Sequence, residues 1–179
     1  MAEPRHFDPA TGYRISQYRA PTPAEVPGGT RIGIDELDAL VAEGEAVLVD
    51  VMPAIGGGYD PASGVWRLAR AHAHIAGSTW LPDVGKGMLD GNLERYFRDC
   101  LSALTGGQKE RALVVYCQSD CWMGWNAAKR AASYGYRRIY WYPDGIDGWR
   151  DHERALMPAR AVPLVVGEAA GAARCRLAD

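Results

Sequence analysis

The sequence predicts an α/β fold in which helices flank a short parallel sheet on both faces. Short apolar runs at residues 46–51, 112–116 and 138–142 are typical of buried strands. Stretches with helical periodicity occur at 93–104 and at 127–134, and the second of these is rich in alanine. A strand, a helix and a further strand joined by short links form a βαβ unit, in which the two strands run parallel. The last two strands and the helix between them have this order, so the sheet is predicted to be parallel.

The size and charge of the chain exclude several classes of protein. A chain of 179 residues can bury about 70% of its surface, which suffices for one core without disulfide staples. The formal net charge of −2 offers no basic surface of the kind that binds nucleic acid. No run approaches the roughly 18 apolar residues of a membrane span. We therefore expect one globular domain with neither nucleic acid nor a membrane as a partner.

The chain divides into an extension, a domain and a tail. Residues 1–30 contain five prolines and three glycines, so we expect an irregular segment draped over the domain. Residues 31–160 form the expected domain, and 161–179 form a tail rich in alanine and glycine that is expected to fray. The first residues have no apolar secretory signal. This start fits either a cytoplasmic protein or a chain from which a signal peptide has been removed.

The N-terminal half of the domain is expected to begin with a helix. Asp35 is a suitable cap for its first turn, and Gly44 is a suitable stop. The first buried strand, 46–51, follows. Residues 54–70 show no periodicity and are expected to be an insertion, whereas 79–82 are expected to form another short strand.

The C-terminal half contains the clearest amphipathic helix, 93–104. Its expected cap is Asn92, and it ends before Gly106. The second helix is expected to begin near Gly124 and to end at Gly135, between the last two strands.

Cys117 directly follows the strand 112–116, at the edge where open parallel sheets bind ligands. The backbone amides of residues 118–123 can form an anion-binding nest there, and the N-terminus of the next helix favours the thiolate. A persulfide anion would be held by the same donors. Free cysteines are also commonly buried for packing alone, so position leaves a functional and a packing role equally open.

The run 113–149 resembles the active-site half of a rhodanese-like domain. In that family a strand ends in the catalytic Cys and leads into a cradle loop, an Ala-rich helix, a Gly-Tyr turn, a strand and a Gly-Ile-x-Gly-Trp close. The close is Gly-Ile-Asp-Gly-Trp at 145–149 in this chain. Residues 49–51 resemble the family's Asp-bearing strand, and 73–78 resemble its Gly-His-Ile-Pro-Gly-Ala stretch. The resemblance implies a rhodanese-like fold.

The resemblance also implies roles for particular residues. Cys117 would be the nucleophile and sulfur carrier, Asp50 a buried carboxylate that supports the ligand edge of the sheet, and His74 a structural residue. The loop residues that would surround the substrate are Gln118, Ser119, Asp120, Trp122, Met123, Gly124 and Trp125. Neither a metal ion nor a cofactor is implied.

Residues 117–126 and 140–145 are similar to a narrower group within the family. These are the rhodanese-like proteins named for a Cys-x-x-Cys-Trp type motif and associated with PQQ-dependent alcohol catabolism. Members are usually exported, so the resemblance implies a periplasmic protein whose signal peptide has been removed, while a cytoplasmic location stays open. It implies a small sulfur-containing anion or a protein thiol as partner, and a PQQ-dependent dehydrogenase system as a further partner.

The loop departs from typical sulfurtransferase loops because it contains no arginine. Trp122 and Met123 stand where such loops place an Arg that contacts the anionic substrate, and the loop is one residue longer than the common form. Phosphoryl transfer relies on charge stabilisation, which makes a phosphatase a poor fit. We expect a bulkier, more apolar or protein-borne sulfur donor in place of thiosulfate. Whether the domain is a rhodanese-type enzyme at all stays open.

Cys121, four residues after Cys117, admits three interpretations. It is a resolving thiol for an oxidised or persulfidated Cys117, one half of a redox or metal-binding pair, or a residue that packs inward. A metal pair is the weakest of the three, because His72 and His74 are far away in the sequence. Cys100 is expected in the core, and Cys175 is expected to be an incidental thiol.

The leading hypothesis is sulfur transfer or thiol redox chemistry at Cys117. The alternative from another class is a non-catalytic binding module, which recognises a cofactor or a partner dehydrogenase through the cradle loop and its Trp residues. Thioredoxin-like thiol–disulfide exchange ranks last, because the spacing from Cys117 to Cys121 is one residue too long for it.

Overall fold

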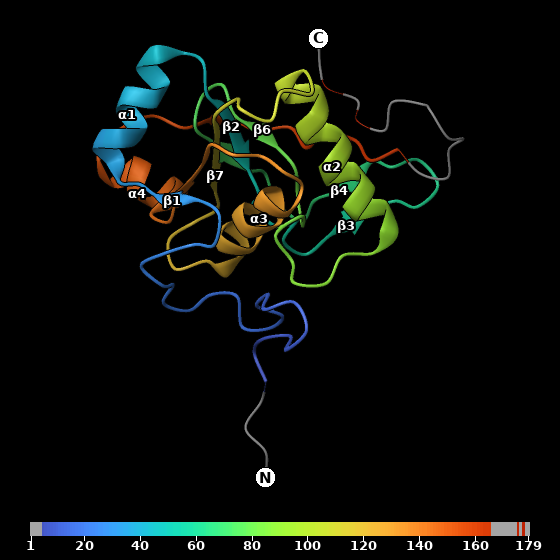
Figure 1. The fold of residues 1–179 in the computed structure, drawn as a ribbon. Helices are drawn as coiled ribbons and strands as arrows, with labels where there is room; N and C mark the ends of the chain where they lie inside the picture. The colour runs from blue at the N-terminus through green and yellow to red at the C-terminus, as the bar shows by residue number, and fades with distance from the viewer. Residues whose placement is uncertain (1–4, 166–174, 176, 178–179) are drawn as a thin grey trace.

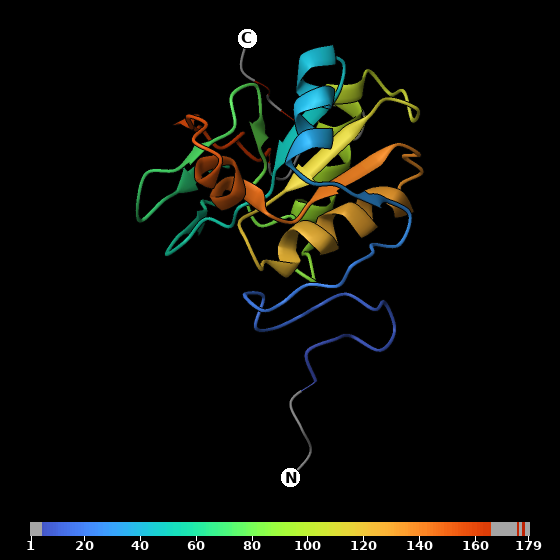
Figure 2. The same ribbon diagram turned by 90° about the vertical axis from the view of Figure 1, so that its left-hand side faces the viewer.

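The fold is an α/β arrangement built on one parallel sheet (Figures 1 and 2). The computed structural model describes residues 5–165, 175 and 177. Five strands lie in the order β1-β8-β7-β2-β6, and every adjacent pair is parallel. Their bounds are β1 Thr30–Arg31, β2 Val47–Asp50, β6 Thr79–Trp80, β7 Leu113–Tyr116 and β8 Ile139–Tyr142.

Helices cover both faces of the sheet, as the sequence predicts. In Figure 1, α1 and α4 lie on one side of the strands, and α2 and α3 lie on the other. The helices are α1 Ile34–Glu43, α2 Gly91–Thr105, α3 Trp122–Ser133 and α4 Gly145–Asp151. The predicted fold class is therefore confirmed.

The central strand β7 carries the core and sets the position of the ligand edge. All four of its residues are fully buried, which explains why it is a continuous apolar run in the sequence. In register, Tyr116 at the end of β7 pairs with Asp50 of β2 and with Tyr142 of β8. The residues after these three strand ends therefore meet at one edge.

Three helix starts differ from their predicted positions. The N-cap of α1 is Gly33, whose amide donates to the Glu36 carboxylate at 3.1 Å, and Asp35 lies inside the first turn. The cap of α2 is Asp90, whose carboxylate accepts a hydrogen bond from the Leu93 amide at 2.8 Å, whereas Asn92 lies inside the first turn. Both residue types are good caps, so composition alone does not distinguish them. Helix α3 begins at Trp122, two residues before Gly124, and Cys121 is its N-cap.

The segment 54–70 is a folded hairpin. β3 (Gly58–Tyr59) pairs antiparallel with β4 (Trp66–Arg67), and the buried Trp66 donates its indole N–H to the Val162 carbonyl at 2.9 Å. Strands of two residues are too short to show a period, which is why the sequence pattern missed them. A second short pair joins β5 (Ala73–His74) to β9 (Met157–Pro158).

Cys100 and Cys175 form a disulfide, so the expectation of an incidental thiol at Cys175 is wrong. Cys100 is fully buried on α2, as predicted. The two cysteines are 75 residues apart, and no spacing pattern relates them. The fraying expected of the tail falls mainly on 166–174, 176, 178 and 179, which lie outside the described residues. Among the described residues, no helix has both the length and the apolar character needed to cross a bilayer.

Candidate active site

The loop between β7 and α3 begins with Cys117 at the ligand edge of the sheet. The first turn of α4 packs directly on the Cys117 peptide, and the Ile146 amide donates to the Cys117 carbonyl at 3.1 Å. Gly145 makes this approach possible. It has a φ of 59°, and a Cβ at this position would lie 2.5 Å from the Cys117 carbonyl oxygen. Part of the Gly-Ile-x-Gly-Trp motif therefore holds the loop after β7 in place.

The two loop cysteines lie in contact. Their Sγ atoms are 2.7 Å apart, and both residues are buried, with Cys117 2% and Cys121 4% exposed. The Sγ of Cys117 also lies 3.5 Å from the Met52 sulfur. The spacing of four residues thus brings the thiols close enough to share a proton or to form a bond.

The surroundings of the two thiols shift their pKa values in opposite directions. Burial raises the pKa of the Cys117 thiol well above its usual value, and the neighbouring Cys121 and Asp50 raise it further. The pKa of Cys121 is lowered, first by the hydrogen bond from Cys117 and then by the backbone amides of Met123, Gln118 and Gly124. Cys121 also caps the positive end of α3. These surroundings therefore favour an anion on Cys121 over an anion on Cys117.

The loop amides lower the pKa of Cys121 through more donors than they do the pKa of Cys117. Gln118 is the backbone donor that lowers the pKa of Cys117, whereas Gln118, Met123 and Gly124 all act on Cys121. Asp120, which precedes Cys121, has a φ of 48° in the left-handed region.

Asp147 of α4 holds the loop through two hydrogen bonds from Ser119. Its Oδ2 accepts hydrogen bonds from the Ser119 amide at 3.0 Å and from the Ser119 hydroxyl at 2.9 Å. Its Oδ1 pairs with Arg150 at 2.7 Å. Sequence reasoning missed this role, because an Asp inside a Gly-rich motif is first of all a turn former.

The N-terminal extension forms one wall of the site (Figure 2). Residues 5–29 contain no helix or multi-residue strand, but Arg19 forms an isolated antiparallel bridge with Cys121. The Trp122 amide donates to the Tyr18 carbonyl at 2.8 Å. The indole N–H groups of Trp122 and Trp125 donate to carbonyls of the extension at 3.1 and 3.0 Å. Both rings are therefore used to attach the extension to α3.

A cavity of about 600 Å³ lies between the extension and the loop. Cys121 lines it together with Gln118 and Met123 of the loop region. The other lining residues are Gln17, Tyr18, Arg19, Pro53, Ile55 and Lys86. The cavity thus combines apolar walls with two cationic side chains. Trp122 and Trp125 do not line it.

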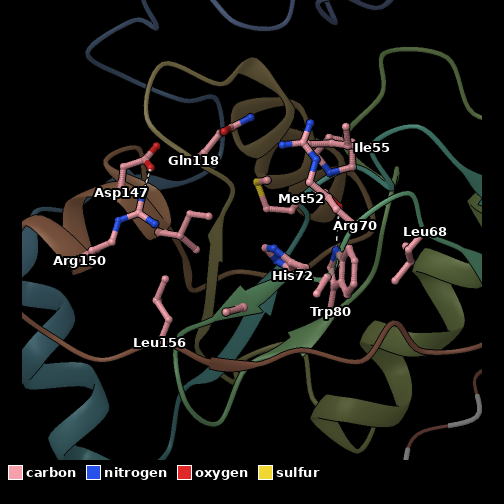
Figure 3. A pocket seen from close by; sticks show the side chains of 14 residues that line it. Met52, Ile55, Leu68, Arg70, His72, Trp80, Gln118, Asp147, Arg150 and Leu156 are labelled. Atoms are coloured by element: carbon pink, nitrogen blue, oxygen red, sulfur yellow. Dashed lines mark hydrogen bonds and ion pairs between the residues drawn. The ribbon is translucent and has the colours of Figure 1, made fainter.

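A second cavity, of about 320 Å³, lies on the other side of Gln118 (Figure 3). In Figure 3, His72 and Met52 lie at its centre and Asp147 and Arg150 at one side. Gln118 lines both cavities. The two spaces therefore share a boundary at the residue that follows Cys117.

Asp50, His72 and His74 form a compact group beside this second cavity. Asp50 is fully buried; its Oδ2 lies 2.6 Å from His72 Nε2 and 3.0 Å from His74 Nδ1, and its Oδ1 accepts from the Met52 amide at 2.9 Å. Within the described part of the chain, these residues could hold a metal ion, since their donor atoms lie within 4.8 Å of one another. As they stand, hydrogen bonds to Asp50 occupy one nitrogen of each imidazole. Sequence reasoning gave His72 no role, because it lies 22 residues from Asp50 and the two side chains come together only in the folded chain.

Comparison with known proteins gives one family. The family described as Rhodanese-like domain matches residues 33–152. No curated protein sequence resembles the chain at a significant level.

Solved structures with a similar fold include an anaerobic ergothioneine biosynthesis enzyme from Chlorobium limicola in complex with trimethyl histidine. It is 21% identical with a TM-score of 0.47, and the match covers 76% of this chain but 33% of that enzyme. A polysulfide-sulfur transferase from Wolinella succinogenes is 18% identical with a TM-score of 0.44, over 73% of this chain and 79% of that one. The human single-domain sulfurtransferase TSTD1 is 22% identical with a TM-score of 0.42, over 68% and 95%. This chain therefore spans about a third of the ergothioneine enzyme and most of the other two.

Proposed function

The chain belongs to the rhodanese-like family, and from this premise we propose that it transfers sulfane sulfur through the Cys117–Cys121 pair. The observation that carries the proposal is the contact of two thiols, 2.7 Å apart, at the ligand edge of a parallel sheet. A thiolate of the pair attacks the outer sulfur of the donor, and the bond between the donor's two sulfur atoms breaks. The donor remainder leaves with the electron pair, and the protein retains a persulfide anion.

The donor is a sulfur anion with an apolar body, such as an organic thiosulfonate or the persulfide of a small thiol. Two features of the site support this class. No basic side chain stands in the loop from Cys117 to Trp125, so backbone amides and not an Arg stabilise the anion there. The adjoining cavity places Tyr18, Pro53 and Ile55 near the cationic Arg19 and Lys86.

A turnover assay tests the proposal. Wild-type protein is given benzenethiosulfonate with dithiothreitol as reductant, and sulfide production is measured. We expect turnover that is lost in the double variant Cys117→Ser/Cys121→Ser and that is slower with thiosulfate as donor. Turnover by the double variant at the wild-type rate would refute the proposal, and an inactive wild type that still binds a ligand would favour the binding module.

We also propose that the chain acts in PQQ-dependent alcohol oxidation. The similarity of residues 117–126 and 140–145 to the group with the Cys-x-x-Cys-Trp type motif supports this assignment. Calorimetric titration with a PQQ-dependent alcohol dehydrogenase, and separately with PQQ, tests it. We expect binding to the dehydrogenase, and absence of heat in both titrations would count against the association.

A periplasmic location is the last part of the proposal. The Cys100–Cys175 disulfide supports it, because such bonds persist in oxidising compartments and are rare in a reducing cytosol. Cell fractionation of the source organism, with free thiols blocked at lysis, is the test. Recovery of the protein in the cytoplasmic fraction with both cysteines reduced would contradict it.

A further inference from the structure

We propose that Cys121, and not Cys117, accepts the sulfur atom from a donor in the 600 Å³ cavity, and that Cys117 then resolves the persulfide. This assignment of roles rests on the proposed function and goes beyond it. In the sequence, Cys117 has the position of the nucleophile. In the folded chain, the direction of access and the charge of the pair both favour Cys121.

Access distinguishes the two thiols. Cys121 lines the cavity formed by the extension and the loop, and Cys117 does not. Cys117 is enclosed by Met52 on one side and by Cys121 on the other, and the first turn of α4 covers its carbonyl. A donor in this cavity therefore meets Cys121 first.

The electrostatic surroundings of the two thiols also favour Cys121 as the attacking residue. Cys121 occupies the N-cap position of the twelve-residue helix α3, where the helix dipole favours an anion, and the amides of Met123, Gln118 and Gly124 lower its pKa. The thiolate is the form that attacks sulfur, and burial raises the pKa of Cys117, which disfavours its thiolate. The hydrogen bond from Cys117 further stabilises the Cys121 anion.

The cavity supplies the cations that the loop lacks. Arg19 lines the cavity and lies in the segment whose backbone pairs with Cys121, so the extension adds a cationic residue beside the site. Lys86 lines the same space while it pairs with Asp83 at 3.4 Å. An anionic donor with an apolar body is therefore held by side chains outside the loop.

The proposed reaction has three steps. The Cys121 thiolate attacks the sulfane sulfur of a thiosulfonate, a sulfinate leaves, and Cys121 carries a persulfide anion. The Cys117 sulfur then attacks the inner sulfur of this persulfide. A Cys117–Cys121 disulfide forms, and the outer sulfur leaves as hydrosulfide with the proton from Cys117. An external dithiol reduces the disulfide and restores the pair.

The decisive experiment compares two matched variants, Cys117→Ser and Cys121→Ser. Each is exposed to benzenethiosulfonate, and intact-mass and peptide-mapping spectrometry locate the added sulfur. We expect Cys117→Ser to retain one added sulfur atom on Cys121, because no thiol is left to resolve it. We expect Cys121→Ser to take up sulfur slower than Cys117→Ser by about tenfold or more, since burial raises the pKa of its remaining thiol.

The outcomes separate this inference from the proposed function. Rapid loading of Cys117 in Cys121→Ser, together with an unloaded Cys121 in Cys117→Ser, would overturn the assignment and leave sulfur transfer intact. If neither variant gains sulfur and wild type forms no Cys117–Cys121 disulfide with the donor, both the assignment and the proposed function are overturned. A measurement without substitutions guards against misfolded variants: limiting iodoacetamide should label Cys121 before Cys117 in reduced wild-type protein. Labelling of Cys117 first would contradict the assignment.

Discussion

Cys117 and Cys121 are chemically identical side chains that the fold makes unequal. Both are buried and their sulfur atoms touch, yet the helix terminus and the loop amides act mainly on Cys121. Cys117 faces the Met52 sulfur and the charge of Asp50, neither of which stabilises an anion. One thiolate shared between two thiols is the expected state of such a pair, because two adjacent buried charges repel each other.

The hydrogen bond between the thiols gives a prediction about pH. Alkylation by iodoacetamide follows the thiolate fraction, so its rate rises with pH around the pKa of Cys121. Because the hydrogen bond from Cys117 is the leading cause of the lowered pKa, Cys117→Ala should move the midpoint of this rise to higher pH. Cys117→Ser keeps an O–H donor and should leave the midpoint closer to that of wild type. A midpoint in Cys117→Ala at or below the wild-type midpoint would contradict this account of the pair.

The start of α4 determines where the loop from Cys117 to Cys121 lies, and this gives a second prediction. Gly145→Ala places a Cβ 2.5 Å from the Cys117 carbonyl, so the loop must shift. Gly44→Ala is the matched control, because Gly44 has a similar φ of 71° but no atom within 4 Å of the added carbon. The control should cost about 1 kcal/mol from the left-handed backbone alone.

Gly145→Ala should cost about 2 kcal/mol more than the control in urea unfolding and should also slow sulfur uptake. Equal losses of stability, with normal sulfur uptake in both variants, would show that α4 does not position the loop.

The N-terminal extension supplies a charge to the cavity, and this gives a third prediction. Arg19→Gln should raise the KM for an anionic thiosulfonate by about threefold at low salt, the size expected of an exposed charge. The effect should fade as salt screens it. Arg31→Gln, on the exposed edge strand β1, is the control and should leave the KM unchanged. Equal effects of the two substitutions would mean that Arg19 acts only through net charge.

For the molecule as a whole, the Cys100–Cys175 bond gives a fourth prediction. It ties α2 to a residue 75 positions further along the chain, and closure of a loop of this length corresponds to about 4 kcal/mol in the chain-entropy description. Cys175→Ser should lower the free energy of unfolding by up to this amount, and added reductant should do the same to wild type. An unchanged urea midpoint under both conditions would contradict a structural role for the bond.

The architecture could be predicted where one physical signal dominates. The fully buried β7 is a continuous apolar run, and α2 has clear helical periodicity, so both are visible in the sequence. The loop cysteine after β7 follows from the same reasoning, because strand ends in parallel sheets bind ligands.

Features that depend on distant pairing could not be predicted. β1 is a strand only because Thr30 and Arg31 pair with β8, and two residues carry no periodic signal. The bridge from Arg19 to Cys121 and the approach of His72 to Asp50 likewise join segments with no local pattern in common.

A single-turnover measurement on wild-type protein tests most directly whether the loop pair transfers sulfur. Reduced protein is mixed with an equimolar amount of benzenethiosulfonate without added reductant, and free sulfide and remaining loop thiols are measured together. The account predicts that hydrosulfide appears while Cys117 and Cys121 become linked to each other. If no sulfide is released and both thiols stay free while the donor remains unchanged, the loop pair does not transfer sulfur.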